Sequence, residues 1–363
     1  MDYINYVKQQ PLTGMTGLGG GATGLGRYSS GGYATTGVNY GSRGIFAGGY
    51  NSYQTQNDEI RYITIDTTSN TSDFGEFSQY MPWQGAGCSN GTRGLIIGGY
   101  GTHGNQYASY VTIGSLGNAT NFGVFNSFSS PYALQQCGAW CDGGRAIRMG
   151  GSGNYFAQYV DRKWMDYVQI ATTGNSTEFG QMAEPHMQSC CAGDLERVVI
   201  AGDSSGMSGT DGKVTMEYVT MATKSNSSDF GDYSNDGIGG AAGTSNNTRG
   251  IFAGGSVPSV GATTQIYYIT VQTTGNTNTF GNLSQLRNSL PADTNGTRAV
   301  FAAGSTGQGG YNAPCYRNTN TMDYITIANT GNASDFGDYM MCCLLYTSPS
   351  PRDATLSRMP SSA

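Results

Sequence analysis

The sequence is poor in charge, in lysine and in histidine, and it contains no long apolar run. Charged residues make up only 12% of the 363 residues, and the formal net charge is −6. An acidic chain with few basic residues lacks the positive surface that binds nucleic acid, so no nucleic-acid partner is expected. No apolar stretch approaches the roughly 18 residues of a membrane-spanning helix, so no membrane insertion is expected. The N-terminal residues lack a basic segment followed by an apolar one, so no signal peptide is visible.

Glycine and tyrosine are abundant instead, with 57 Gly and 25 Tyr residues. High glycine with low charge often signals disorder, but aromatic residues reach 11% and β-branched residues are frequent. This composition favours short strands joined by tight turns, and the length allows a large core. We therefore expect an all-β protein.

Two phrases recur six times along the chain. The first reads Arg-Gly-Ile-Phe-Ala-Gly-Gly at 43–49, and successive copies follow at intervals of 50, 52, 52, 52 and 49 residues. The second runs from a Tyr to a Phe that lies twelve positions later in every copy. The framework arginines are Arg43, Arg93, Arg145, Arg197, Arg249 and Arg298. The framework tyrosines are Tyr62, Tyr110, Tyr167, Tyr218, Tyr268 and Tyr324, and the framework phenylalanines are Phe74, Phe122, Phe179, Phe230, Phe280 and Phe336.

Constant and variable spacings alternate within each unit. Both phrases keep their lengths in all six copies, whereas the two segments between them vary. The apolar first phrase predicts a strand buried on both faces, and the alternating residues at 62–65 predict a half-buried strand. Turn residues such as Thr173-Gly174-Asn175 separate this strand from a short one that begins around the framework Phe. With a further strand before each framework Arg, every unit holds four strands.

These units resemble the kelch repeat family of β-propellers, whose repeats have this length, an apolar strand that ends in Gly-Gly, and a later Tyr and aromatic. The resemblance implies a kelch-like β-propeller of six four-stranded blades over residues 31–342. The framework Phe lies farther from the Tyr than the usual kelch Trp does. The repeated phrases are also similar to repeats in tail and appendage proteins of environmental bacteriophages.

The two ends of the chain depart from the repeat. Residues 1–30 are either a Gly-rich leader or a degenerate half-repeat, and the second interpretation would permit seven blades in an untruncated protein. Residues 343–363 begin with Cys343–Asp353, which resembles a translated transposase-type sequencing adapter, and the rest continues the adapter in frame. We expect this tail to be non-native and disordered, and the natural reading frame to be truncated near the sixth unit.

Connections of constant and of variable length are expected to lie on opposite faces of the ring, because a propeller blade is a meander. The constant face carries the turn from first to second strand and the turn from third to fourth. The variable face carries the other two connections, and loops on a rigid scaffold usually carry binding. Rigid aromatic rings on this face would suit a glycan or a protein epitope. The expected binding residues are Tyr53, Tyr107, Tyr155, Phe156, Trp164, Tyr311 and Tyr316.

Other candidate motifs favour structural roles. The framework arginines are expected either to pair with the acids that precede the framework Phe or to bond turn carbonyls. The cysteines near them are expected to be buried packing residues, and the two histidines, His103 and His186, form no recognisable metal site with them. No recurring acid pair or phosphate-binding loop is found, so we expect no catalytic residue, no metal and no cofactor. These cysteines are Cys88, Cys137, Cys141, Cys190 and Cys191.

Together these observations predict a non-enzymatic binding or structural protein whose variable face recognises a glycan or protein receptor. The resemblance to phage proteins implies a virion appendage, with other virion proteins as additional partners. A bacterial kelch-like adhesin or lectin, extracellular or at the cell surface, is an alternative. A carbohydrate-active enzyme or an oxidase on the same scaffold is a third.

Overall fold

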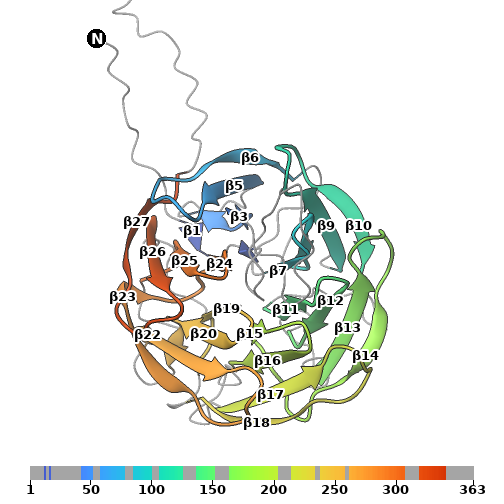
Figure 1. Cartoon of the computed structure of the whole chain (residues 1–363). Coiled ribbons are helices and arrows are strands. Elements are labelled where there is room, and N and C mark those ends of the chain that lie inside the picture. Colours follow the sequence, from blue (N-terminus) through green and yellow to red (C-terminus); the bar gives the residue numbers. More distant parts are fainter. Residues whose placement is uncertain are drawn as a thin grey trace, which may run out of the picture.

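The computed structural model describes residues 12–13, 16–17, 42–51, 58–77, 85–99, 106–125, 136–151, 163–202, 214–233, 238–257, 261–306 and 319–340. The named elements among them are all β-strands, and these strands form six antiparallel blades around a common centre (Figure 1). The prediction of an all-β, six-bladed propeller is confirmed.

Each blade is a meander whose strands pair in order from the centre to the rim. The first strands are β2 (Thr16–Gly17), β7 (Ala86–Ser89), β11 (Gly138–Cys141), β15 (Cys190–Gly193), β19 (Ala242–Ser245) and β24 (Ala292–Thr294). The second strands are β3 (Arg43–Ala47), β8 (Arg93–Ile97), β12 (Arg145–Met149), β16 (Arg197–Ala201), β20 (Arg249–Ala253) and β25 (Arg298–Ala302). The third strands are β5 (Glu59–Thr64), β9 (Tyr107–Thr112), β13 (Trp164–Gln169), β17 (Thr215–Thr220), β22 (Gly261–Thr270) and β26 (Thr321–Thr326). The fourth strands are β6 (Ser72–Glu76), β10 (Thr120–Val124), β14 (Thr177–Gln181), β18 (Ser228–Asp232), β23 (Asn278–Arg287) and β27 (Ser334–Asp338).

Three short strands supplement the blades. β1 (Leu12–Thr13) pairs with β4 (Tyr50–Asn51), and β21 (Ser256–Val257) pairs with the start of β22. Strands β22 and β23 have ten residues each, and the other third and fourth strands have five or six. Blade five therefore has the longest outer hairpin of the six.

The second strand is the apolar centre of each blade. Its framework Arg is half-buried and the next four residues are buried in all six copies. Side chains from both faces of this strand enter the clusters between adjacent blades, as Phe46 does against blade six and Ile45 does against blade two. The unbroken apolar phrase in the sequence reflects this burial on both faces.

The framework Phe is the extra residue of a β-bulge in every blade. The pairing of third and fourth strands skips it, as where Met165 pairs with Gly180 and Asp166 with Glu178. The bulge turns the Phe ring toward the framework Tyr of the same blade, edge to face, with ring centroids 5.9 to 6.2 Å apart. The constant spacing of twelve residues keeps this pair of rings in register.

Each framework Arg joins its own blade to the next. Its guanidinium stacks on the framework Tyr of its blade, with the central carbon 4.1 to 5.4 Å from the ring centroid. One terminal nitrogen donates to the main-chain carbonyl after the third strand of the next blade, at 2.5 to 3.4 Å. Of the two partners expected for these arginines, turn carbonyls are the ones observed.

An Asn in the turn between the third and fourth strands clamps each junction. Its Oδ1 accepts a hydrogen bond from the main-chain amide two residues after the framework Phe of the preceding blade, at 2.9 to 3.1 Å. The carbonyl of that same residue accepts from the amide that follows the Asn, at 2.8 to 3.1 Å. The Asn is therefore an inter-blade contact as well as a turn residue. The six are Asn70, Asn118, Asn175, Asn226, Asn276 and Asn332.

The Gly after each framework Phe allows this close contact. A Cβ atom at Gly281 would lie 2.0 Å from the carbonyl oxygen of Gly331 in the next blade. The corresponding distance at the other five junctions is 2.2 to 2.5 Å. No side chain fits there, so the Phe-Gly pair is imposed by the neighbouring blade.

The ring closes by the same contacts between blade six and blade one. Arg298 donates to the carbonyl of Ile65, and the amide of Asp338 donates to Asn70. Phe46 of blade one packs with Val300 and Phe336 of blade six in one buried cluster. These contacts fill the position that a seventh blade would need, so the ring has six.

Blade one obtains its innermost strand from far upstream. Thr16 and Gly17 of β2, within the segment expected to be a leader or a degenerate half-repeat, pair with Ala47 and Phe46. The residues expected to form this strand, just before Arg43, lie outside the described residues. The next inward-facing amide, that of Ile45, donates to the carboxylate of the fully buried Asp293 in blade six, at 3.0 Å. Asp293 thus joins the two blades where the chain closes the ring.

The close contact at the Phe-Gly pair can be tested at one junction. We expect Gly281→Ala to lower the free energy of unfolding by about 2 kcal/mol or more, because the new Cβ collides with main chain. The matched control is Gly331→Ala on the other side of the junction, where a Cβ meets nothing within 4 Å; its effect should stay within about 0.5 kcal/mol. Urea unfolding of the two variants measures the difference, and equal losses would contradict the close approach.

Candidate functional site

The structure describes two of the seven aromatic residues expected to bind. Tyr107 begins β9 and is 36% exposed, and Trp164 begins β13 and is half-buried. Both side chains therefore lie at the variable-face end of a third strand. The other five, in longer loops, lie outside the described residues: Tyr53, Tyr155, Phe156, Tyr311 and Tyr316.

The two ends of the third strand differ in how strictly they repeat. At the constant-face end, two residues after the framework Tyr, five of the six blades have Thr and blade three has Gln169. The five are Thr64, Thr112, Thr220, Thr270 and Thr326. Three residues before each framework Tyr, at the variable-face end, the side chains are exposed or half-buried and chemically diverse. They are Glu59, Tyr107, Trp164, Thr215, Gln265 and Thr321. Sequence variation thus concentrates on the face expected to bind.

The variable-face ends of the third strands form what we call the variable edge. Two residues farther along each third strand lies a buried position that is polar in every blade. The residue before each framework Tyr is at most 8% exposed in every blade, and it faces the preceding blade. Three of these residues are acids, although this position lies inside an otherwise apolar strand. The set is Arg61, Ser109, Asp166, Glu217, Tyr267 and Asp323. Sequence reasoning missed them, and the signal that could have found them is the triplet Met-acid-Tyr at 165–167, 216–218 and 322–324.

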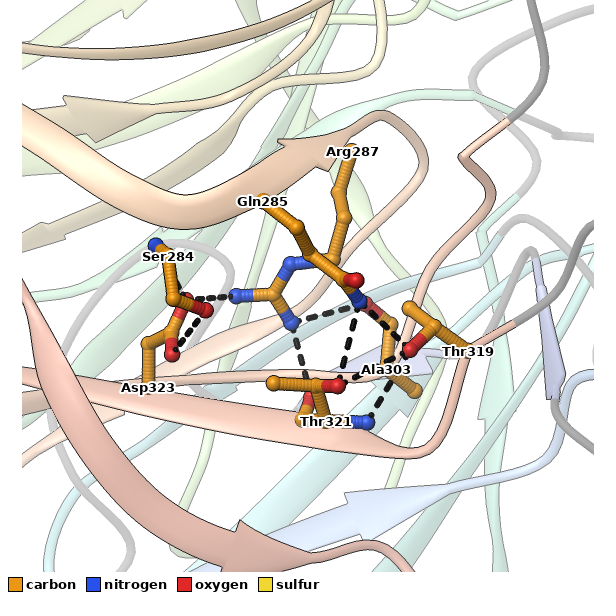
Figure 2. Close-up of polar contacts among 7 residues, drawn as sticks. All are labelled: Ser284, Gln285, Arg287, Ala303, Thr319, Thr321 and Asp323. Carbon is orange, nitrogen blue, oxygen red and sulfur yellow. Dashed lines mark hydrogen bonds and ion pairs between the residues drawn. The ribbon is translucent and has the colours of Figure 1, made fainter.

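The junction between blades five and six holds one of these acids, Asp323, in a network of polar contacts (Figure 2). Arg287, at the end of β23, donates to the Asp323 carboxylate at 2.5 Å and to the carbonyls of Ala303 and Thr321. The amide and the hydroxyl of Ser284 also donate to Asp323. Burial lowers the pKa of Arg287, and the Asp323 carboxylate opposes that effect. With both side chains fully buried, the pair holds the connection from blade five against blade six.

Above this pair lies a half-exposed polar surface. The Gln285 side-chain amide donates to the hydroxyls of Thr319 and Thr321, which lie 3.0 Å from each other (Figure 2). All three side chains are half-buried at the variable edge. Such a group of amide and hydroxyl side chains offers donors and acceptors to a hydroxyl-rich ligand.

At the junction between blades three and four, His186 faces the buried acid Glu217 as Arg287 faces Asp323. His186 Nε2 lies 3.5 Å from Glu217, and its Nδ1 lies 2.8 Å from the carbonyl oxygen of Gly202. The amides of Ala183 and Glu184 also donate to the Glu217 carboxylate. Burial raises the pKa of Glu217, but the contacts with His186 and the Ser227 hydroxyl outweigh it, so the pKa is lowered.

These three side chains do not make a hydrolase triad. The Ser227 hydroxyl donates to the Glu217 carboxylate instead of to the imidazole, so His186 cannot take its proton directly. His186 and Glu217 are each only 1% exposed. The arrangement can hold a connection in place, but it cannot reach a substrate as it stands.

The third acid is paired within its own blade. Arg148 of β12 donates to Asp166 at 2.6 Å, and both side chains are fully buried. Arg148 also donates to the carbonyl of Gly150, and the Ser176 hydroxyl donates to the same carboxylate. A buried pair of this kind is costly to break, because removing one partner leaves an uncompensated charge.

The five cysteines near the framework arginines are all buried with free thiols. Burial raises the pKa of the Cys137 thiol to about 11 and that of the Cys190 thiol to about 12. Thiols held in the protonated form are poor nucleophiles and poor metal ligands. Within the described ranges, no group of three or more His, Cys, Asp or Glu side chains could hold a metal ion.

Comparison with known proteins shows a likeness to solved structures. No protein-family model matches the chain, and neither does any curated protein. The solved structure of YjhT superposes with a TM-score of 0.64 at 12% identity, covering 91% of this chain and 99% of that chain. The likeness shows the fold alone. Among the described residues there is also no helix long and apolar enough to cross a membrane.

The lowered pKa of Glu217 gives stability a defined dependence on pH. Because the ionised form is favoured in the folded state, its contribution is present above the ordinary carboxyl range and is lost as pH falls through the lowered pKa. We expect Glu217→Gln to cost about 2 kcal/mol at pH 7 and progressively less below about pH 4. Urea unfolding at pH 7 and at pH 3 measures the loss of stability, with Glu76→Gln at an exposed position as the control. A cost that is the same at pH 7 and pH 3 would refute the assignment.

Proposed function

We propose that this chain is a non-enzymatic binding protein that presents the variable face of its propeller to a glycan. One observation carries the proposal: third strands that end in Thr on one face in five of the six blades begin with chemically different side chains on the other. The constant face is committed to blade contacts through its arginines and asparagines, so it has little freedom to vary. Selection for recognition would act on the opposite face.

The described part of the variable face supports a glycan as the ligand. Gln285, Thr319 and Thr321 form a half-exposed group of amide and hydroxyl side chains at the junction of blades five and six. Trp164 and Tyr107 add ring surfaces at other blades, and such rings contribute contact area at little conformational cost. Polar donors beside aromatic surfaces suit a sugar, and a protein receptor is the alternative outcome of the binding test.

The buried acids support binding without catalysis. Glycoside hydrolysis needs two carboxyl groups that reach the scissile bond from either side. Asp166, Glu217 and Asp323 are at most 1% exposed. Asp166 accepts hydrogen bonds from its own blade, and Glu217 and Asp323 accept them from the connection that leaves the preceding blade. Among the described residues, Glu217 and Asp323 hold connections at the variable edge, and Asp166 holds Arg148 within its own blade.

We further propose that the protein is carried on a virion, where other virion proteins would be its partners. The similarity of the repeated phrases to those of phage appendage proteins supports this location. The genes beside the coding sequence provide the test. Capsid and tail genes are the expected neighbours, whereas secretion and cell-wall genes would point to a bacterial adhesin instead.

A glycan array with the protein lacking residues 343–363 tests the binding function. We expect binding that Gln285→Ala combined with Thr321→Ala weakens about tenfold or more, because two hydrogen-bonding groups are lost. The control is Thr68→Ala in an exposed turn of the constant face, which should bind as the parent does. Absence of binding to every glycan, with capture of a protein receptor instead, would replace the glycan by a protein ligand. Turnover of a bound sugar would overturn the non-enzymatic assignment.

A further inference from the structure

Two connections on the variable face are held by equivalent contacts that differ in the cation. His186 and Arg287 each lie seven residues after the framework Phe of their blade. Each faces an acid that immediately precedes the framework Tyr of the next blade, Glu217 and Asp323 respectively. The two junctions, three to four and five to six, therefore place a cation and an acid at matching positions.

The main-chain contacts match as well. The amide four residues after the framework Phe, that of Ala183 or Ser284, donates to the acid at 3.0 or 3.1 Å. The carbonyl of the cationic residue itself accepts from the second Gly of the Gly-Gly pair, Gly151 or Gly255, at 2.8 Å in both cases. The same set of contacts thus holds both connections. They differ in the cationic side chain, His or Arg, and in the acid, Glu or Asp.

The difference in cation matters because arginine keeps its charge at all physiological pH values, whereas histidine changes its charge between about pH 5 and 8. His186 is 1% exposed, and both of its ring nitrogens face acceptors, the Gly202 carbonyl and the Glu217 carboxylate. An imidazolium can donate to both. A neutral imidazole has one N–H group, so it would turn a lone pair toward one of the two oxygens.

Other charged groups also lie around His186. On its own connection, Glu184 is half-buried; Lys163, just before β13, donates to the carbonyl of Ala183. On blade four, Asp229 of β18 lies opposite Glu217 in the ladder and is exposed. Ordinary carboxylates and amines do not titrate between pH 5 and 8. Histidine is therefore the side-chain type in this cluster whose ordinary pKa lies in that range.

We propose that the connection Met182–Gln188 is a pH-sensitive latch on the variable face, closed by charged His186 and loosened when the imidazole loses its proton. The Arg287 latch at the other junction stays closed throughout. The inference goes beyond the binding function and does not depend on any ligand.

Amide hydrogen exchange resolved to single residues tests the latch in the unmodified protein. After correction for the intrinsic rates, we expect Ala183 and Glu184 to lose about tenfold in protection between pH 5.5 and 8, as a charge-assisted contact is lost. The amide of Ser284 is the internal control and should keep its protection. A change of equal size at Ser284, or no change at Ala183 and Glu184, would overturn the proposal without any variant.

Two reciprocal substitutions then locate the effect. His186→Arg should abolish the dependence on pH at Ala183, and Arg287→His should create one at Ser284. His103→Gln removes the other histidine of the chain and should leave the pattern as in the parent. If His186→Arg retains the full dependence, another group is responsible and the latch assignment fails.

Discussion

The contact between the Phe-Gly pair of one blade and the Asn turn of the next is the constraint on which the whole ring depends. It brings main chain to main chain so closely that a side-chain carbon at the Gly has no room. It recurs at all six junctions, including the one that joins the last blade to the first. Because each junction must satisfy the same geometry, the residues around it can change little from unit to unit.

Buried acids with a cationic partner recur at one position in this apolar stack, the residue before the framework Tyr in blades three, four and six. A buried charge costs several kcal/mol unless a partner offsets it, so each acid there comes with its own cation and hydrogen-bond donors. The partners differ among junctions: Arg148 on the same blade, and His186 or Arg287 on the preceding one. The His186 and Arg287 pairs fasten connections at the variable edge, whereas the Arg148 pair lies within blade three.

The division of labour between the two faces follows from these contacts. Arginines and asparagines at the constant face are occupied by neighbouring blades, while the opposite ends of the same strands vary from Glu59 to Trp164 to Thr321. A rigid ring with one invariant and one variable face suits recognition. The fold itself hosts many activities, so the proposed function rests on the variable face and the polar group around Gln285.

The sequence by itself determined the number of units, the strand order within each unit and the two faces, because both phrases repeat at constant lengths and strand periodicity can be read locally. It also indicated buried cysteines and structural arginines. Only the tertiary structure decided which atoms those arginines bind, that the turn asparagines clamp adjacent blades, and that Thr16 and Gly17 complete blade one. These contacts join residues about 30 to 270 positions apart. The alternation of apolar and polar residues along a strand does not separate a buried acid such as Glu217 from an exposed one such as Glu76, because the neighbouring blade determines which is buried. Only the repeated Met-acid-Tyr triplet marks the buried acids in the sequence.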